Sequence, residues 1–383
     1  MKILGGNQVV FYTTQKGNLE VKLTDCLEQL EVYMDKHQIY PGSFIRHNIF
    51  LNITDQGTYD AIKPKLAIIA KRRFPLPMLV NVIPLTPAEG ELALESTYIK
   101  STSWNCLFKE SKYGSCQLMK KDKVNVVIGS VQVHKYPDMQ KNAEKAFEQM
   151  EGLLDKCGLG MGDLVKQWSY IEHLLDEDIL TQRYQTFNDV RTRYYDIDFS
   201  ESGYPASTEV GIHTGGIIIE FLAVNDRDKR SLKINNPRQK APHEYSQEVL
   251  ATEGAYIKST PTTPKLERAR SLSIDNKTMV FISGTSSIIG ERITAGGDVK
   301  EQTVVALENI KKISSLQNLG EAGIQTSEKG TFTLIKAYVN SKLYFEDVYD
   351  LLSKTFVDIP LVLVQTDLPR KDILVELEVE LML

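Results

Sequence analysis

Three glutamates near the end of the chain stand at alternate positions of one apolar run. They are Glu376, Glu378 and Glu380, within and just after residues 373–379. Because strand side chains alternate between two faces, these carboxyl groups share one face. Arg370 precedes the run and brings a fixed cation near them. Such a set suits an acidic small molecule, since one group holds it and another moves a proton. The alternative is a solvated edge strand whose charges prevent aggregation.

A second apolar run, residues 361–364, lies shortly before the first. A short stretch that contains Pro369 joins the two runs. Two alternating runs joined in this way predict a β-hairpin near the C-terminus. We expect one face of this hairpin to border a cleft or water.

A polar and aromatic stripe is predicted on a helix that ends near residue 194. Tyr184, Asn188, Arg191 and Tyr195 recur at helical spacing, so they lie on one side of that helix. Such a stripe suits a ligand with a carboxylate and a ring. The alternative is an amphipathic helix whose tyrosines pack and whose arginines are solvated.

Two further segments offer small polar groups to a ligand. Ser207 and Thr208 enter a predicted strand, where hydroxyl and backbone N–H groups can hold an oxyanion. Residues Gly284, Thr285 and Ser286 follow another strand, and glycine permits a close approach of the backbone to a ligand. Ordinary strand-end capping and a simple turn are the alternatives. Neither segment has a nucleotide-binding consensus.

The composition is that of a globular protein long enough for two or three domains. Of 383 residues, 42% are hydrophobic and 25% charged, and the net charge of -5 does not favour nucleic acid. No apolar run approaches the roughly 20 residues of a membrane span. The first residues lack the apolar core of a signal peptide, so we expect a cytoplasmic protein. The four cysteines and six histidines show no metal-ligand spacing, so no metal site is expected.

Each third of the chain repeats one order of elements. The order begins with an amphipathic helix, a strand and a second helix. It continues with a bulky residue followed by Pro, a strand, a turn and a strand that carries a Glu. We therefore predict three tandem α+β units, with mixed sheets covered by helices, around a pseudo-threefold axis. The predicted domains are 1–122, 123–235 and 236–383. The polar segments 100–122 and 226–275 are predicted to be connectors on the surface. Because they are long for plain linkers, we expect that they also line a site.

The repeated unit resembles the RidA/YjgF family, whose members form trimers with ligand sites between subunits. A chain that carries such units in tandem is more specifically similar to the chorismatases. The motifs behind this narrower resemblance occur in the family's order and are specific only together. They are YQTFNDVRTRYY (184–195), YPAST (204–208), NPRQ (236–239), TPKLERAR (263–270), FISGTSSIIG (281–290) and DLPRKDILVELE (367–378).

This resemblance implies an enzyme that cleaves the enolpyruvyl ether of chorismate. The products would be pyruvate and a dihydroxycyclohexadiene or hydroxybenzoate acid. Glu376 matches the family's acid and would protonate the enolpyruvyl methylene, and water or a ring hydroxyl would trap the oxocarbenium-like centre. A carboxyl group protonated at neutral pH needs a pKa raised by burial or by neighbouring acids such as Glu378 and Glu380. Arg370 and Arg191 would pair with the two substrate carboxylates.

The resemblance places the pocket between the second and third repeats. It implies no metal or organic cofactor, and a monomer that forms an internal pseudo-trimer and can assemble further. The expected partner is a chorismate-like acid rather than nucleic acid or a membrane. Because Glu376 and Arg370 occur together only in the third repeat, we expect one working cleft. The other pocket residues that it implies are Tyr184, Tyr195, Ser207, Thr208, Gly284, Thr285 and Ser286.

The chain departs from the family pattern at four positions. Glu291 and Ala295 stand where histidines are usual, Pro369 where Cys is usual, and Glu209 where Gly is usual. These departures leave the product open. Two other functions also stay open: a RidA-type deaminase of 2-imino acids, and a non-catalytic protein that binds a small acid. Against the deaminase, the arginine expected after the bulky residue and Pro is absent from all three repeats.

Overall fold

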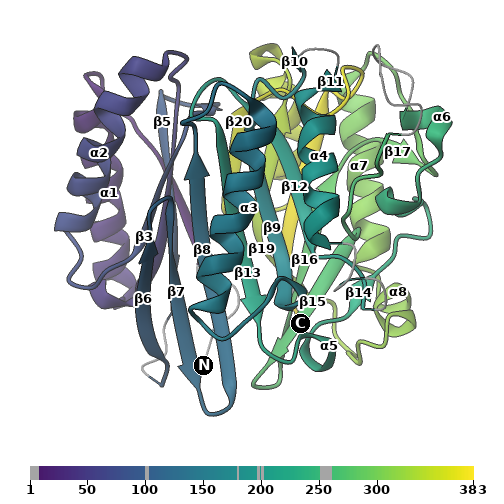
Figure 1. Cartoon of the computed structure of the whole chain (residues 1–383), viewed down its shortest axis with the longest axis horizontal. Coiled ribbons are helices and arrows are strands. Elements are labelled where there is room, and N and C mark those ends of the chain that lie inside the picture. Colours follow the sequence, from purple (N-terminus) through teal and green to yellow (C-terminus); the bar gives the residue numbers. More distant parts are fainter. Residues whose placement is uncertain (1–7, 100–102, 179–180, 196–198, 200–201, 251–260) are drawn as a thin grey trace.

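The computed structural model describes residues 8–99, 103–178, 181–195, 199, 202–250 and 261–383 (Figure 1). The first part contains β1 (Gln8–Tyr12), α1 (Leu19–His37), β2 (Phe44–Leu51), α2 (Gln56–Arg72), β3 (Leu79–Ile83), β4 (Thr86–Pro87) and β5 (Leu92–Tyr98). The middle part contains β6 (Asn105–Ser111), β7 (Gly114–Lys121), β8 (Val124–Val133), α3 (Met139–Asp155), β9 (Leu164–Glu172), β10 (Glu177–Asp178), β11 (Thr181–Gln182), α4 (Arg183–Tyr195), β12 (Ala206–Ile212) and β13 (Ile217–Val224).

The last part begins with short elements and ends in the third unit. The short elements are α5 (Arg227–Arg230), β14 (Lys233–Ile234), α6 (Gln247–Leu250) and β15 (Ala269–Ile274). The others are β16 (Lys277–Thr285), β17 (Ile288–Ile289), β18 (Arg292–Ile293), α7 (Val299–Ile313), α8 (Leu316–Glu321), β19 (Thr331–Val339), α9 (Phe345–Thr355), β20 (Leu361–Gln365) and β21 (Val375–Met382).

Three groups of four strands repeat one topology, which confirms the predicted tandem units. The strand order is β1-β5-β2-β3 in the first unit, β8-β13-β9-β12 in the second and β16-β21-β19-β20 in the third. In each unit the second strand in this order is antiparallel to both neighbours. The last two strands in the order are parallel to each other. Strand β1, which begins the first unit, is absent from the elements that the sequence predicts.

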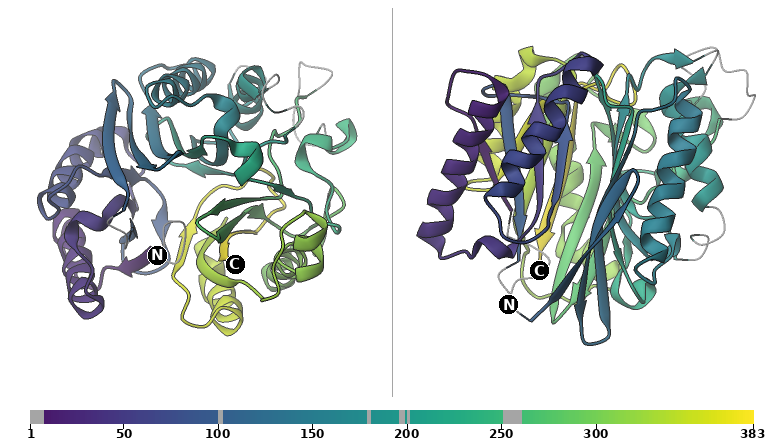
Figure 2. Two further views of the ribbon diagram at one scale, coloured as in Figure 1. Left: turned by 90° about the horizontal axis from the view of Figure 1, so that it is seen from below. Right: turned by 60° about the vertical axis from the view of Figure 1, so that its left-hand side comes forward.

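The helices lie on the outside, and the three sheets face a common centre (Figure 2). Side chains before the long helices fix where they begin: Asn18, Asp55, Asp138 and Asp298 each accept a hydrogen bond from a first-turn N–H. Strand β13 is buried along its whole length, because helices cover one face of its sheet and the other units cover the opposite face. This double burial explains its nearly continuous apolar sequence.

The prediction of a C-terminal hairpin is wrong. β20 and β21 do not pair with each other, because β19 lies between them, parallel to β20 and antiparallel to β21. Alternating apolar residues predict strands and their faces, but they do not identify a strand's neighbour. The linking residues 366–374 are long enough to cross the end of one strand, which occupies roughly 5 Å of the sheet.

The connector predicted over residues 100–122 is also different in the structure. Residues 100–102 lie outside the described part, and β6 and β7 form a hairpin that extends the second sheet beyond β8. The prediction of a linker therefore missed two strands, which pair with each other and continue the pairing from β8. The later connector adds β14 and β15 to the third sheet. Its residues 251–260, including Ser259 and Thr260 of the Pro/Thr stretch, lie outside the described part.

Candidate active site

The site lies beside a layer of buried charges at the centre of the molecule. Glu95, Glu220 and Glu378 occupy equivalent positions in the three units, and each is at most 1% exposed. The residues that face them on the neighbouring middle strands are Asn48, Trp168 and Lys336. Such carboxylates persist in a protein interior only when cations and donors surround them.

Two cations from different units hold the first two glutamates. Arg46 pairs with Glu95 at 2.8 Å and with Glu220 at 2.9 Å. Lys336 Nζ lies 2.9 Å from the second oxygen of Glu95, so the third unit is tied to the first. These ion pairs fix the three sheets relative to one another.

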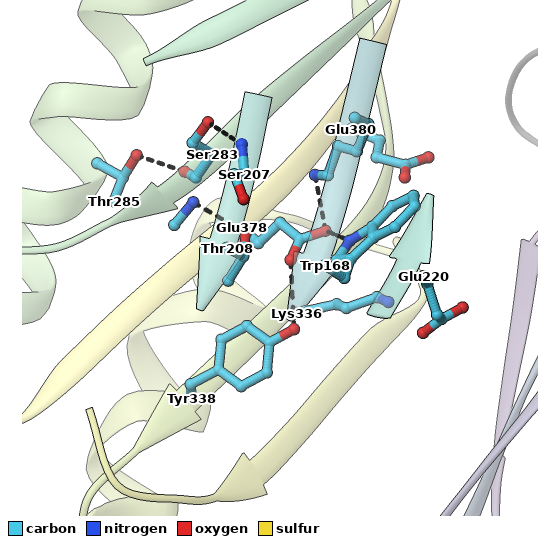
Figure 3. Close-up of polar contacts among 12 residues, drawn as sticks. Trp168, Ser207, Thr208, Glu220, Ser283, Thr285, Lys336, Tyr338, Glu378 and Glu380 are labelled. Atoms are coloured by element: carbon cyan, nitrogen blue, oxygen red, sulfur yellow. Dashed lines mark hydrogen bonds and ion pairs between the residues drawn. The ribbon is translucent and has the colours of Figure 1, made fainter. Parts of the chain in front are cut away.

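Glu378 is held as a carboxylate in the same layer. Its Oε1 lies 2.8 Å from Lys166 Nζ and accepts a hydrogen bond from the Trp168 indole, and its Oε2 accepts one from the Tyr338 hydroxyl (Figure 3). Burial by itself would raise the pKa of Glu378, but Lys166 and Lys336 outweigh it and lower the pKa to about 2.

Glu376 lies two residues earlier on the same face of β21 and has a different environment. Its side chain is buried and makes no ion pair with any described residue. Burial and then the carboxylates of Glu209 and Glu378 raise the pKa of Glu376 to about 8, and Arg268 lowers it only in part. Two neighbouring acids of one strand therefore differ in charge at neutral pH, as proton transfer requires.

A bulge in β16 makes room for Glu376. The register of β16 against β21 shifts between Ile282 and Thr285. At Gly284 in this bulge, a Cβ atom would lie 2.0 Å from Glu376 Oε1, so any larger residue would displace that carboxyl group. The bulge also joins two units, because Ser283 Oγ accepts a hydrogen bond from Ser207 N, and Gly284 N donates to Thr208 Oγ1 (Figure 3).

Glu376 opens into a cavity of about 90 Å³ between the second and third units. Two arginines line it, and both lie near the ring of Tyr245. The guanidinium of Arg370 is 5.2 Å from the ring centre and that of Arg268 is 5.7 Å from it. Arg268 also donates to the Tyr245 hydroxyl and to the carbonyl of Lys240. The cavity thus combines fixed cations with an acid, which is the arrangement that binds and protonates an anionic molecule.

A second carboxyl group, Glu209 of β12, also lines the cavity. Arg191 Nη1 and the hydroxyl of Ser207 both donate to its Oε1. Arg191 is fully buried, and its Nη2 donates to Asn188. Glu209 therefore holds the guanidinium that the resemblance assigns to a substrate carboxylate.

The structure brings together six of the ten site residues inferred from the sequence. Those that line the cavity are Tyr184, Ser207, Gly284, Ser286, Arg370 and Glu376. The other four lie behind its wall. Arg191 pairs with Glu209, Tyr195 donates to Gln167, Thr208 accepts from Gly284, and Thr285 donates to the carbonyl of Ser283.

Three polar lining residues are missing from that set: Glu209, Tyr245 and Arg268. Arg268 belongs to the TPKLERAR motif, so its place in that motif was the available signal. Glu209 stood out only as a departure from the family pattern. Nothing in the sequence around Tyr245 marks it, although the later connector was expected to line a site and does so through this residue and Pro242.

Within the described ranges, no three His, Cys, Asp or Glu side chains are grouped to hold a metal ion. No helix in the described part is both long and apolar enough to cross a membrane.

Comparisons with known proteins find relatives of this sequence and of this fold. A family model described as "Chorismatase FkbO/Hyg5-like, N-terminal" matches residues 106–223. The chain is 27% identical over 254 residues to a chorismatase of Streptomyces rapamycinicus, covering 64% of this chain and 72% of that protein. It is 29% identical over 248 residues to a 3-hydroxybenzoate synthase of Streptomyces hygroscopicus, covering 61% and 67%. A crystal structure of a chorismatase superposes over 99% of this chain and 100% of that one, with a TM-score of 0.72 and 18% identity.

Proposed function

We propose that this chain is an enzyme of the chorismatase type that cleaves the enolpyruvyl ether of chorismate to release pyruvate, and both its similarity to chorismatases and the geometry of its cavity support this. The other product is a dihydroxycyclohexadiene or hydroxybenzoate acid. One observation carries this proposal: a buried glutamic acid, Glu376, has its pKa raised to about 8 in a cavity that two arginines line.

Glu376 supplies the proton. Because its pKa lies above neutral, most of the group carries a proton at pH 7 and can donate it to the enolpyruvyl methylene. Protonation leaves a cation on the carbon that bears the ether oxygen. The nearby carboxylates of Glu209 and Glu378 stabilise that positive charge, because both lie close enough to affect Glu376.

Arg268 and Arg370 supply the anchors for the two substrate carboxylates. Among the described residues, Arg268 Nη1 has no hydrogen-bond partner, while its other nitrogens are fixed to Lys240 and Tyr245. Within the described residues, Arg370 makes a single hydrogen bond, of 3.3 Å, to the carbonyl of Glu291. Both guanidiniums thus keep donors available for an incoming carboxylate.

The cavity of about 90 Å³ is smaller than chorismate, so binding requires lining side chains to move. Arg370 and Tyr184 are only half-buried, and they are the residues that we expect to yield. Their movement would widen the cavity without disturbing the central ion pairs.

The test is pyruvate release from chorismate, followed with a coupled assay. The purified chain should release pyruvate, and Glu376→Gln should reduce the rate by about 10²-fold or more while retaining substrate binding. Glu248→Gln, at an exposed surface pair, is the matched control and should keep the wild-type rate. No pyruvate from the folded wild-type protein would refute the proposal and direct the assay to 2-imino acids.

A further inference from the structure

The cavity contains a second carboxylate that the proton transfer from Glu376 does not use. Glu209 lines the same cavity as the acid and is 4% exposed. Both of its protein donors, Arg191 Nη1 and the Ser207 hydroxyl, bind the same oxygen, Oε1. No described residue donates a hydrogen bond to its Oε2. One oxygen is therefore anchored and the other is available.

The two carboxyl groups of the cavity differ in whether a cation is paired with them. Glu209 is paired with a fully buried guanidinium, whereas Glu376 has no cation paired with it among the described residues. The charge of Glu209 is one reason that Glu376 keeps its proton. Acid and base roles are separated in this way when two carboxyl groups share one site.

We propose that Glu209 is the general base that activates the water trapping the cation, so that the ring product is the dihydroxycyclohexadiene acid. This inference rests on the proposed cleavage of chorismate. It follows because a hydroxybenzoate acid and pyruvate together contain the atoms of chorismate alone, whereas the diol requires one water molecule. A base at the cavity wall can take the proton that the attacking water loses. A ring hydroxyl that trapped the cation would also lose a proton, so the identity of the ring product distinguishes the two routes.

The protons balance between the two carboxyl groups. Glu376 gives its proton to the methylene carbon, which becomes a methyl group. Water adds to the cationic carbon and loses one proton to Glu209, which yields a hemiketal. The bond between this carbon and the ring oxygen then breaks, the ring oxygen takes the proton back from Glu209, and the hemiketal hydroxyl returns a proton to Glu376 as the pyruvate carbonyl forms.

Arg191 is a positioning residue in this scheme. It contacts Glu209 and Asn188 but does not line the cavity. It holds Glu209 Oε1, which leaves Oε2 for the water. Tyr184, on the same helix, lines the cavity beside them.

The experiment measures pyruvate and ring products chromatographically for wild type and Glu209→Gln. We expect the diol from wild type and a fall of about 10²-fold or more in diol formation in the variant, with KM changed little. Formate added to Glu209→Gly should restore part of the diol rate, which a structural role would not produce. Glu248→Gln again serves as the control.

The outcomes separate this inference from the proposed function. Pyruvate with a hydroxybenzoate acid as the wild-type ring product would overturn the base role alone, as would an unchanged diol rate in Glu209→Gln. Absence of pyruvate from wild type would overturn both. If Glu209→Gln does not fold because Arg191 is left unpaired, the double variant Arg191→Met with Glu209→Gln removes the charges together, a change that buried pairs often tolerate. That variant should fold and form diol at the same reduced rate, and a wild-type rate would refute the inference.

Discussion

At the scale of single residues, the chemistry depends on two acids of one strand with different environments. Glu378 has Lys166 at 2.8 Å and a pKa lowered to about 2, whereas Glu376 has no cation paired with it in the described part of the chain and has a pKa raised to about 8. Both side chains are buried, so burial alone does not distinguish them. The cations facing Glu378 make the difference.

The rate should depend on pH through Glu376. Its protonated form is the reactive one, so activity is present below pH 8 and falls as the pH rises through about 8. Above that value the rate of pyruvate release should decline about tenfold per pH unit. A rate that rises steadily to pH 10 in a protein that remains folded would contradict the acid role.

Arg268→Gln should change both binding and this pH profile. Loss of a guanidinium that binds a carboxylate should raise KM by about tenfold or more. Since Arg268 lowers the pKa of Glu376, its removal should move the alkaline limb of the profile to higher pH. If neither the alkaline limb of the pH profile nor KM changes in this variant, Arg268 does not belong to the site.

Gly284→Ala should displace Glu376, because the added Cβ would lie 2.0 Å from its Oε1. A misplacement of about 1 Å can lower a rate by about 10²-fold, so kcat should fall while the fold is kept. Gly296→Ala is the control, since nothing lies within 4 Å of a Cβ there. Equal effects of the two substitutions on kcat would rule out the steric explanation.

At the scale of elements, β21 carries both the acid and the charge that helps tune it. Its neighbour β19 supplies Lys336 and Tyr338 to Glu378, while the bulged β16 leaves space beside Glu376. Strand β9 of the second unit adds Lys166 and Trp168. The strand is thus held between its own sheet and the next unit.

Lys166→Met should strongly destabilise the protein. It leaves the buried carboxylate of Glu378 without its nearest cation, and breaking a buried pair typically costs about 3–5 kcal/mol. Lys145→Met, which removes an exposed pair with Glu148, should cost less than about 1 kcal/mol. Urea unfolding of both variants measures the difference. Similar midpoints for the two would show that the central pair does not hold the units together.

Because of the same ion pair, we expect the free energy of unfolding to decrease at low pH. The folded pKa of Glu378 lies below its unfolded value, so its stabilisation is present above about pH 4.5 and is lost as the pH falls through about 2. Urea midpoints measured from pH 6 downward should decline more in wild type than in Glu378→Gln. Parallel declines would contradict this role.

At the scale of the whole molecule, the three units are alike in topology but not in chemistry. A cavity of about 350 Å³ lies between the first and second units, at the place equivalent to the proposed active site. In that cavity, Ile218 of the second unit is at the position equivalent to Glu376 of the third unit. Val82 of the first unit is at the position equivalent to Glu209 of the second unit. That cavity therefore lacks both the acid and the base.

We accordingly expect one catalytic site per chain. Calorimetry with a non-reactive diacid analogue of chorismate should give one equivalent bound per chain, and Arg268→Gln should weaken that binding. Lys63→Met, in the cavity between the first two units, is the control and should leave the stoichiometry unchanged. Two independent equivalents in wild type would contradict a single working cleft.

The sequence by itself determined the units and the face of the acids. Alternation placed Glu376, Glu378 and Glu380 on one side of a strand, and the repeated order of helices and strands indicated three similar sheets. Both are local patterns, which strand and helix geometry impose on any chain.

Only the tertiary structure decided the neighbours of those residues. It inserted β19 between β20 and β21, paired Arg191 with Glu209, and brought Arg268 and Tyr245 into the cavity. These contacts join residues far apart in the chain, and local periodicity contains no information about such pairs. The pKa of Glu376 is likewise set by burial and by charges that include Glu209 and Arg268 from distant parts of the chain, so its role as an acid depends on the assembled fold.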